Sequence, residues 1–465
     1  MVIGREAELI TLKEYLNAPR AGILVVYGRR RVGKTTLIEY AFKKERLLKI
    51  EGIEKQGKST QIRRALEQLQ TYFPDELVAT SNIKSWSKFF KLLANLVKAG
   101  RWVIFLEEFQ WLSNYSQEMT AELKYAFDNY FQKNPKLKII ICGSAPSFIV
   151  KNVLHSKALH NRALDQLHLK PLSLKETREL LGPGVSLQEA MDGLLTVGGI
   201  PEYLIYLKKR SSVLLSLAQE SFKPDGFFVD ELARVAVSSL AENQIFFNII
   251  EILAKKKFST RNELLKQLKE KSGSNMTRFF DDLELCGFIE KYHPFNFGDN
   301  SKVQRYRIAD PYLGFYYKFI KPCLSEIRRG SYSKTPLRAL DQEALTKWRG
   351  FAFERYCLNH SAMLAEILGF SAVRYQAGTY FERNSTAQID LIFERADRVL
   401  TVCEVKYTTQ PTSKKVIPEF EKKLEMLRSK FKCSIQKVLI TAAGADKSLT
   451  NTGYFDRIVS LKDFY

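Results

Sequence analysis

The stretch Gly28-Arg-Arg-Arg-Val-Gly33-Lys34-Thr35 decides the fold of the first third of the chain. It is a complete GxxxxGK[ST] pattern, a glycine-rich loop whose backbone cradles phosphates. An apolar, β-branched strand pattern, Gly22 to Tyr27, precedes it, and the spacing from Thr35 to Phe42 predicts a helix. Backbone N–H groups at a helix N-terminus bind anions, so strand, loop and helix together predict a phosphate-binding loop. A chance match in a glycine turn would not have both flanking elements.

The residue types of this loop indicate a nucleotide ligand, ATP, with Mg²⁺. We expect Gly28, Gly33, Lys34, Thr35 and Thr36 to bind it. Lys34 would neutralise the β and γ phosphates, and Thr35 would hold Mg²⁺.

A phosphate-binding loop that hydrolyses ATP also needs acidic residues at the end of another strand, to hold the metal ion and to orient the attacking water. The run Trp102 to Leu106 predicts a buried strand that ends in Glu107 and Glu108. We assign Glu107 to the metal and Glu108 to the catalytic base. Glutamate replaces the usual aspartate at position 107, so slow hydrolysis is an expectation, and an exposed acidic pair after a core strand is the simpler alternative.

Two further polar residues fit the same site. The strand pattern Ile139 to Cys142 ends in Gly143 and Ser144, which places Ser144 beside the γ-phosphate if the strand lies next to the acidic one. Arg162 would reach a phosphate within the chain or from a neighbouring subunit. A turn serine and a surface arginine are the alternatives.

The length of 465 residues corresponds to about three domains. The pattern is α/β at first, with buried parallel strands, then helical, then three short helices followed by two strands, the order of a winged helix. A second α/β segment ends the chain. The predicted domains are 1–170, 171–240, 241–330 and 336–465.

The formal net charge is +21, from 72 Lys and Arg against 51 Asp and Glu. This excess favours a polyanionic partner, and DNA is the default, although basic residues that merely solvate the surface remain the alternative. No apolar run approaches the roughly 18 residues of a membrane span, and the first 17 residues lack a signal-peptide core. We therefore expect a cytoplasmic protein without a membrane partner, and an oligomer is possible.

The first half resembles the archaeal-type ATPases of the AAA+ and STAND group, which commonly carry a restriction-nuclease-like C-terminal domain. The resemblance implies an ATPase core, a helical lid and a winged helix, with Arg5 near the edge of the nucleotide base. Glu107 departs from the family pattern. The matching stretches are Ile3 to Leu9, Tyr27 to Thr36, Phe105 to Leu112, Cys142 to Ser144, Leu169 to Leu172 and Gly198 to Leu204.

The last segment carries a second possible site. Asp390 and Glu404 fall on adjacent predicted strands, and Lys406 lies on the same face as Glu404 because side chains alternate along a strand. Asp390 and Glu404 would hold Mg²⁺ or Mn²⁺, and Lys406 would position water. This resembles the PD-(D/E)XK nuclease core, and Glu354 matches the acidic position on its first helix. Solvated charges on an edge strand are the alternative.

The predicted winged helix offers a second surface for phosphate contacts. Its basic residues are Lys266, Lys269, Lys271, Arg278, Lys302, Arg305 and Arg307. Internal docking is an equally good interpretation of this module.

The leading hypothesis is an α/β multidomain, ATP-regulated, metal-dependent DNA endonuclease. The alternative is an ATP switch whose winged helix and C-terminal domain bind DNA or protein without cleavage. Protein remodelling by a ring-forming machine is less attractive, because no pore loop stands out.

Overall fold

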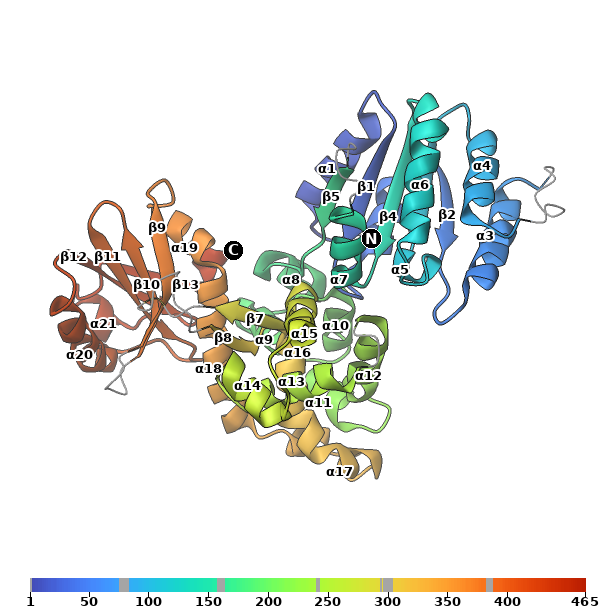
Figure 1. Cartoon of the computed structure of the whole chain (residues 1–465). Coiled ribbons are helices and arrows are strands. Elements are labelled where there is room, and N and C mark those ends of the chain that lie inside the picture. Colours follow the sequence, from blue (N-terminus) through green and yellow to red (C-terminus); the bar gives the residue numbers. More distant parts are fainter. Residues whose placement is uncertain are drawn as a thin grey trace.

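The computed structural model describes residues 2–74, 83–156, 164–239, 243–292, 295, 304–381 and 388–465. These residues form a multidomain α/β protein with two five-stranded sheets and one three-stranded sheet. Figure 1 shows the two large sheets at opposite ends, with helices and the small sheet between them. Within the described ranges, no helix combines the length and the apolar character needed to cross a lipid bilayer.

The first sheet is entirely parallel, with strand order β2-β3-β4-β1-β5. Its side chains alternate between two cores, with Ile23 and Val25 on one face and Leu24 and Val26 on the other. A strand buried on both faces reads as a continuous apolar run, which explains the sequence pattern. The strands are β1 (Gly22–Tyr27), β2 (Arg46–Glu51), β3 (Trp102–Glu107), β4 (Leu137–Gly143) and β5 (Leu164–His168).

Helices cover both faces of this sheet. Leu12 of α1 and Leu37 of α2 belong to one core, and Ile62 of α3, Phe89 of α4 and Leu123 of α6 belong to the other. The helices are α1 (Glu6–Asn17), α2 (Lys34–Ala41), α3 (Lys58–Tyr72), α4 (Trp86–Leu96), α5 (Phe109–Leu112), α6 (Glu118–Asn129) and α7 (Pro146–Ile149). The result is a three-layer arrangement of helices, sheet and helices, as in P-loop proteins.

A helical segment follows. Two of its helices begin with capping boxes, at Ser173 with Glu176 and at Ser186 with Glu189, in which side chains satisfy otherwise free N–H groups. Its helices are α8 (Leu174–Leu181), α9 (Leu187–Val197), α10 (Pro201–Leu207), α11 (Val213–Phe222) and α12 (Phe227–Ser239).

The next segment has the element order of a winged helix. Thr260 and Glu263 form a capping box at the start of its second helix. The small sheet has the order β6-β8-β7. The elements are α13 (Gln244–Ala254), β6 (Ser259–Thr260), α14 (Arg261–Leu268), α15 (Ser274–Leu285), β7 (Ile289–Tyr292) and β8 (Arg305–Ile308).

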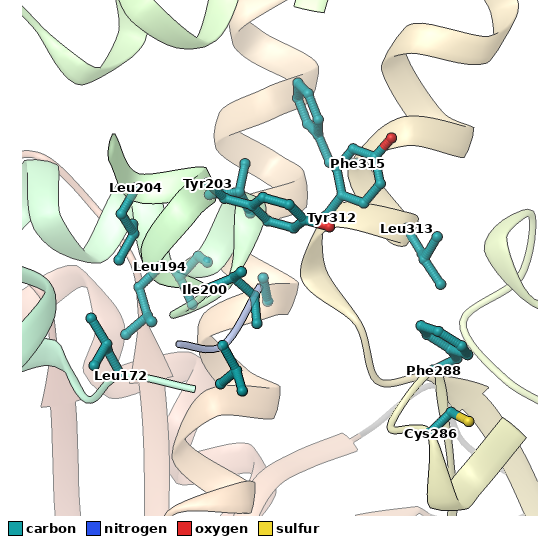
Figure 2. Close-up of a cluster of buried hydrophobic side chains, with 14 of the residues drawn as sticks. Leu172, Leu194, Ile200, Tyr203, Leu204, Cys286, Phe288, Tyr312, Leu313 and Phe315 are labelled. Atoms are coloured by element: carbon teal, nitrogen blue, oxygen red, sulfur yellow. The ribbon is translucent and has the colours of Figure 1, made fainter. Parts of the chain in front are cut away.

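One apolar core joins the helical segment to the residues after β8. Figure 2 shows Tyr203 beside Tyr312, and their ring centroids are 5.4 Å apart. Tyr312, Phe315 and Phe319 are buried, so the aromatic residues of this segment belong to the core. The core helices are α16 (Pro311–Phe315) and the π-helical turn Tyr316–Ile320, and α17 (Leu324–Arg328) follows them.

The C-terminal sheet is mixed, with order β13-β12-β11-β10-β9. Pairing is antiparallel from β9 to β11 and parallel from β11 to β13. The elements are α18 (Gln342–Asn359), α19 (Ser361–Ile367), β9 (Tyr375–Phe381), β10 (Gln388–Arg395), β11 (Val399–Lys406), α20 (Ile417–Arg428), β12 (Ser434–Thr441), α21 (Lys447–Thr450) and β13 (Arg457–Ser460).

The sequence pattern of this domain predicts a helix over 348–368 and a strand over 371–376, and the structure differs at both boundaries. The single helix expected over 348–368 is two helices, and the first begins earlier because Asp341 caps it by accepting from the Ala344 N–H. The strand expected over 371–376 begins at Tyr375, where pairing with β10 starts.

Candidate nucleotide site and C-terminal carboxylate site

The phosphate loop connects β1 to α2, and its glycines are required. A Cβ on Gly28 would lie 2.4 Å from the Leu169 carbonyl oxygen, and Gly33 has a φ of +93° at the N-cap of α2. The Lys34 Nζ donates to the carbonyl oxygens of Gly28 and Arg29, each at 2.9 Å. Burial lowers the pKa of Lys34. The lysine therefore lies in the loop that it is predicted to serve.

The acidic strand end meets this loop directly. The Thr35 hydroxyl donates to Glu107 Oε1, and the Lys49 Nζ lies 2.6 Å from Glu107 Oε2. Glu107 is buried, so its charge is balanced by a lysine from the neighbouring strand β2. The longer side chain of glutamate reaches both partners at once. The structure thus brings the two predicted magnesium residues together.

Glu108 belongs to a separate polar cluster. Its Oε2 accepts from the Ser144 hydroxyl at 2.7 Å and from Gln110 Nε2 at 2.6 Å. Strand β4 lies between β3 and β1, which places Ser144 beside both the acidic strand end and the loop. Glu108 also has a left-handed backbone, with a φ of +48°, a conformation that few glutamates adopt.

Two loop arginines connect the phosphate loop to later parts of the chain. Arg29 pairs with Asp310, which is fully buried before α16. Arg31 pairs with Glu202 and, through its Nε at 2.9 Å, with Glu231 of α12. The loop conformation is therefore tied to the helical segment and to α16.

The other residues predicted to bind the nucleotide differ in burial and in hydrogen-bond partners. Arg5 is buried; its guanidinium donates to Glu8 at 3.1 Å and to the Val32 carbonyl at 3.3 Å. Thr36 is exposed in the first turn of α2. Arg162 lies outside the described residues.

A cavity of about 410 Å³ opens beside Arg5 and Arg29. Its walls include the turn at Pro171 and Leu172 and the turn at Gly199, between the sheet and the helical segment. This volume is in the range of small-molecule sites. The cavity continues from the phosphate loop, since Arg29 belongs to both.

The four predicted C-terminal residues line a second cavity, of about 480 Å³. The β10–β11 register pairs Leu391 with Cys403, which places Asp390 opposite Glu404. The Val405 N–H donates to Asp390 Oδ2 at 3.2 Å. Lys406 and Glu354 line the same space, so the hairpin and α18 bring together all four residues.

Charge in this cavity is closely balanced. Burial raises the pKa of Asp390 to about 7, and the neighbouring carboxylates Glu354 and Glu404 add to the shift. Glu404 is fully buried, with the Lys406 Nζ 2.9 Å from Oε1 and the Lys423 Nζ 2.7 Å from Oε2. Lys423 comes from α20 and neutralises a carboxylate that would otherwise be costly to bury.

Carboxylate oxygens are the donors that Mg²⁺ and Mn²⁺ prefer. Asp390 and Glu404 supply such oxygens in this cavity, so the donor chemistry fits a hard cation, although ammonium groups of Lys406 and Lys423 lie at both Glu404 oxygens. In the part of the chain that the structure describes, however, no three His, Cys, Asp or Glu side chains are arranged to hold a metal ion.

The winged-helix surface differs from the prediction at one residue. Lys266, Lys269, Lys271 and Arg278 are exposed as expected. Arg307 is buried and paired with Glu290, and Arg305 lies over the Phe258 ring at 4.0 Å. The expected phosphate contact of Arg307 is therefore wrong, because Glu290 pairs with its buried guanidinium, whereas Arg305 is half-buried against an aromatic ring and its phosphate contact stays a prediction. Lys302 lies outside the described residues.

Comparison with known proteins identifies the first half. Residues 3–207 match a family described as an ATPase domain predominantly from Archaea. The chain carries an archaeal-type ATPase domain. Residues 316–417 match a family of archaeal and bacterial proteins of unknown function. The second match includes the carboxylate cavity residues from Glu354 to Lys406 and assigns them no activity.

Three individual proteins are similar to this chain. An uncharacterized protein of Methanocaldococcus jannaschii is 26% identical over 413 residues, 88% of each chain. The Walker-type ATPase of Pyrococcus abyssi is 19% identical, covers 68% of this chain and 96% of its own, and has a TM-score of 0.50. The ORC2 protein of Aeropyrum pernix, solved with ADPNP and ADP, is 13% identical over 71% of this chain and 95% of its own, with a TM-score of 0.43.

Sequence reasoning missed three residues that contact the predicted sites, two in the ATPase domain and one in the C-terminal domain. Lys49, Gln110 and Lys423 contact predicted site residues but belong to no motif. Gln110 lies within the stretch Phe105 to Leu112 that resembles the family, which is the one local signal for it. Lys49 and Lys423 are brought in by strand and helix packing.

Proposed function

We propose that this ATPase is an ATP-regulated, metal-dependent DNA endonuclease. One observation carries the proposal: Glu354, Asp390, Glu404 and Lys406 line a single cavity at the ends of two neighbouring strands. An acidic pair and a lysine at a strand end are a suitable set for phosphodiester hydrolysis.

In the ATPase half, the proposed roles follow the contacts. Lys34 would leave the two loop carbonyls to bind the β and γ phosphates, with the N–H groups from Gly28 to Thr36 around them. Thr35 and Glu107 would hold Mg²⁺, which neutralises phosphate charge when bound. Glu108 would accept a proton from the attacking water, and Ser144 would lie close to the γ-phosphate.

In the C-terminal half, Asp390 and Glu404, with Glu354, would hold Mg²⁺ or Mn²⁺; the cation supplies stabilisation of the charge that develops at phosphorus. Lys406 would orient the water whose oxygen attacks phosphorus as the P–O bond to the leaving oxygen breaks. Lys423 would balance the charge of Glu404 before a cation arrives.

DNA is the proposed polyanionic partner. The net charge of +21 and the exposed lysines at and just after the C-terminal end of α14 (Lys266, Lys269 and Lys271) support phosphate contacts that position the duplex without reading its sequence. Such binding weakens steeply with salt. Assembly into oligomers and a cytoplasmic location complete the proposal.

The test compares wild type, Lys406→Ala and Lys462→Ala on plasmid and single-stranded DNA, with Mg²⁺ or Mn²⁺ and with or without ATP. Lys462 is exposed and lies outside the cavity, so it controls for loss of a lysine. We expect cleavage by wild type and Lys462→Ala and none by Lys406→Ala. Equal cleavage by all three preparations would mean a contaminating nuclease and would refute the assignment.

A second candidate is an ATP switch that binds DNA or protein without cleaving it. The two lysines on Glu404 favour it, because they occupy both oxygens of the carboxylate that a cation would need. It predicts nucleotide-dependent DNA binding with no cleavage in any metal.

A further inference from the structure

Helix α18 borders both cavities. Arg355, Tyr356 and His360, at and just beyond its C-terminal end, line the cavity beside Arg5 and Arg29, whereas Glu354 lines the carboxylate cavity. Successive residues of an α-helix point about 100° apart, so Glu354 and Arg355 face different spaces. One helix of the C-terminal domain therefore forms a wall of the nucleotide-side cavity and also supplies a carboxylate to the second site.

Arg355 is the unusual residue of this wall. Within the described part of the chain it donates no hydrogen bond and forms no ion pair, whereas Arg5 and Arg29 in the same cavity are both paired. Burial lowers the pKa of Arg355 to about 10, and the charge of Arg307 contributes. The guanidinium is still charged at neutral pH and half-buried, and a partly desolvated charge without a hydrogen-bond partner is destabilising. Its position calls for a ligand with acceptor atoms.

The rest of the cavity suits a flat, partly apolar ligand. Leu172, Ile200 and Pro311 supply apolar surface, and the rings of Tyr356 and His360 are stacked with centroids 4.0 Å apart. Arg29 links this space to the phosphate loop, so a ligand whose phosphates lie at Lys34 would extend its base into it. A purine nucleotide has that combination of groups.

The helix is also held firmly to the ATPase side. Arg349, on α18, donates through Nε to Thr196 at 3.1 Å and pairs with Asp192 at 3.1 Å. Tyr407, at the end of β11, donates to the same aspartate at 2.7 Å. A displacement of α18 at the nucleotide cavity would therefore be shared by α9 and by the strand that carries Glu404 and Lys406.

We propose that Arg355 of the C-terminal domain completes the nucleotide site by donating to the base or ribose of bound ATP, and that α18 thereby couples nucleotide occupancy to the position of Glu354. Arg355 is a binding residue, and α18 is the connecting element. The coupling deepens the proposed function, on which the role of Glu354 rests, but nucleotide contact by Arg355 stands independently of DNA cleavage.

The first experiment measures ATPγS affinity by calorimetry for wild type, Arg355→Ala, Arg355→Lys and Arg457→Ala. Arg457 is exposed on β13 and provides the matched control. We expect Arg355→Ala to weaken binding by about tenfold or more, since a charge-assisted hydrogen bond is lost. Arg355→Lys should recover part of the affinity, and Arg457→Ala should equal wild type. Unchanged affinity in Arg355→Ala would overturn the contact.

Thermal melting separates binding from folding. Without nucleotide, Arg355→Ala should melt at the wild-type temperature or above it, because the substitution removes an unpaired charge. With ATPγS, its stabilisation should be smaller than that of wild type. A variant that melts lower without nucleotide, yet gains the full nucleotide stabilisation, would show that Arg355 is only structural.

The second experiment follows hydrogen exchange of peptides from α18. We expect saturating ATPγS to slow exchange across residues 350–358 in wild type and not in Arg355→Ala at equal occupancy. Nucleotide binding that leaves these amides unchanged would refute the coupling. Neither experiment uses DNA, so a chain that cleaves no substrate would end the nuclease proposal without touching this one.

Discussion

The ion pair between Arg29 and Asp310 provides the sharpest test of how the phosphate loop is held. The two residues lie 281 positions apart, and the Asp310 side chain has no solvent exposure. Asp310 also accepts from the Leu313 N–H at 2.6 Å and caps α16. Replacing Asp310 with alanine removes both interactions, whereas asparagine keeps the cap and loses the charge.

The two losses have different magnitudes. A lost N-cap costs about 1 kcal/mol. A buried cation left without its partner costs about 3–5 kcal/mol, which we reduce to about 2–3 kcal/mol because the Arg29 side chain keeps 14% exposure and can turn toward water. We therefore expect Asp310→Ala to destabilise the α16 region by about 3–4 kcal/mol and Asp310→Asn by about 2–3 kcal/mol.

Hydrogen exchange of the amides of α16 and the following π-helical turn is the suitable assay, because it reports local opening of one segment in a multidomain chain. The expected loss in Asp310→Ala corresponds to exchange faster by roughly a hundredfold to a thousandfold. The double variant Asp310→Ala with Arg29→Met has no uncompensated cation. Its loss of local stability should therefore be clearly smaller than the sum of the losses in the two single variants. Additive effects, or wild-type exchange in Asp310→Asn, would refute the reasoning.

Three further outcomes are expected. Lys34→Ala should weaken ATPγS binding by about a hundredfold or more in calorimetry, since several charge-assisted hydrogen bonds are lost; retained affinity would mean that the loop does not bind phosphate. Glu108→Gln should bind ATP normally and hydrolyse it about 10²- to 10⁴-fold more slowly in a phosphate-release assay, and unchanged turnover would exclude it as the base. Mn²⁺ binding at the C-terminal cavity should strengthen as pH rises through about 7, where Asp390 loses its proton. Glu404→Gln should lower the pH midpoint of this change, because it removes a negative charge beside Asp390. Mn²⁺ affinity that does not change with pH would contradict the assignment.

The same titration affects folding with a definite sign. An unfolded aspartate ionises near pH 4, whereas Asp390 in the folded chain ionises near 7. Between these values the folded state holds a proton that the unfolded state has released, so the metal-free C-terminal domain loses stability as pH rises from about 4 to about 7. A divalent cation that binds Asp390 should reverse this trend above pH 7.

Local features of the chain were predictable from sequence. The phosphate loop and the acidic strand end were found because each motif is contiguous and lies between elements with clear periodicity. Asp390 and Glu404 could be placed on adjacent strands because the short spacing between the two strand patterns is that of a hairpin, and the structure then sets them opposite each other. In each of these cases the residues are close in sequence, so local backbone geometry restricts where they can lie relative to one another.

Contacts between distant segments were not predictable. Nothing in the spacing of Arg29, Arg349 or Arg307 indicates that these cations pair with Asp310, Asp192 and Glu290. An arginine in a loop or on a wing looks the same in sequence whether it faces phosphate or a buried carboxylate. Only tertiary packing decides, and for Arg307 it decided against the nucleic-acid surface.

The two lysines that pair with Glu404 suggest an order of binding at the C-terminal site, in which the metal ion binds before DNA and nucleotide controls the binding of the metal ion. Without a cation, Lys406 and Lys423 neutralise a fully buried carboxylate, so neither of these ammonium groups is free for phosphate. A cation on Asp390 and Glu404 would take over that role and release both ammonium groups for the DNA backbone. Because Glu354 faces the same cavity from α18, its position would set how readily the cation is accepted. Regulation by nucleotide would then operate on metal affinity rather than on DNA contacts, so ATP should change the metal concentration needed for cleavage more than the affinity for DNA.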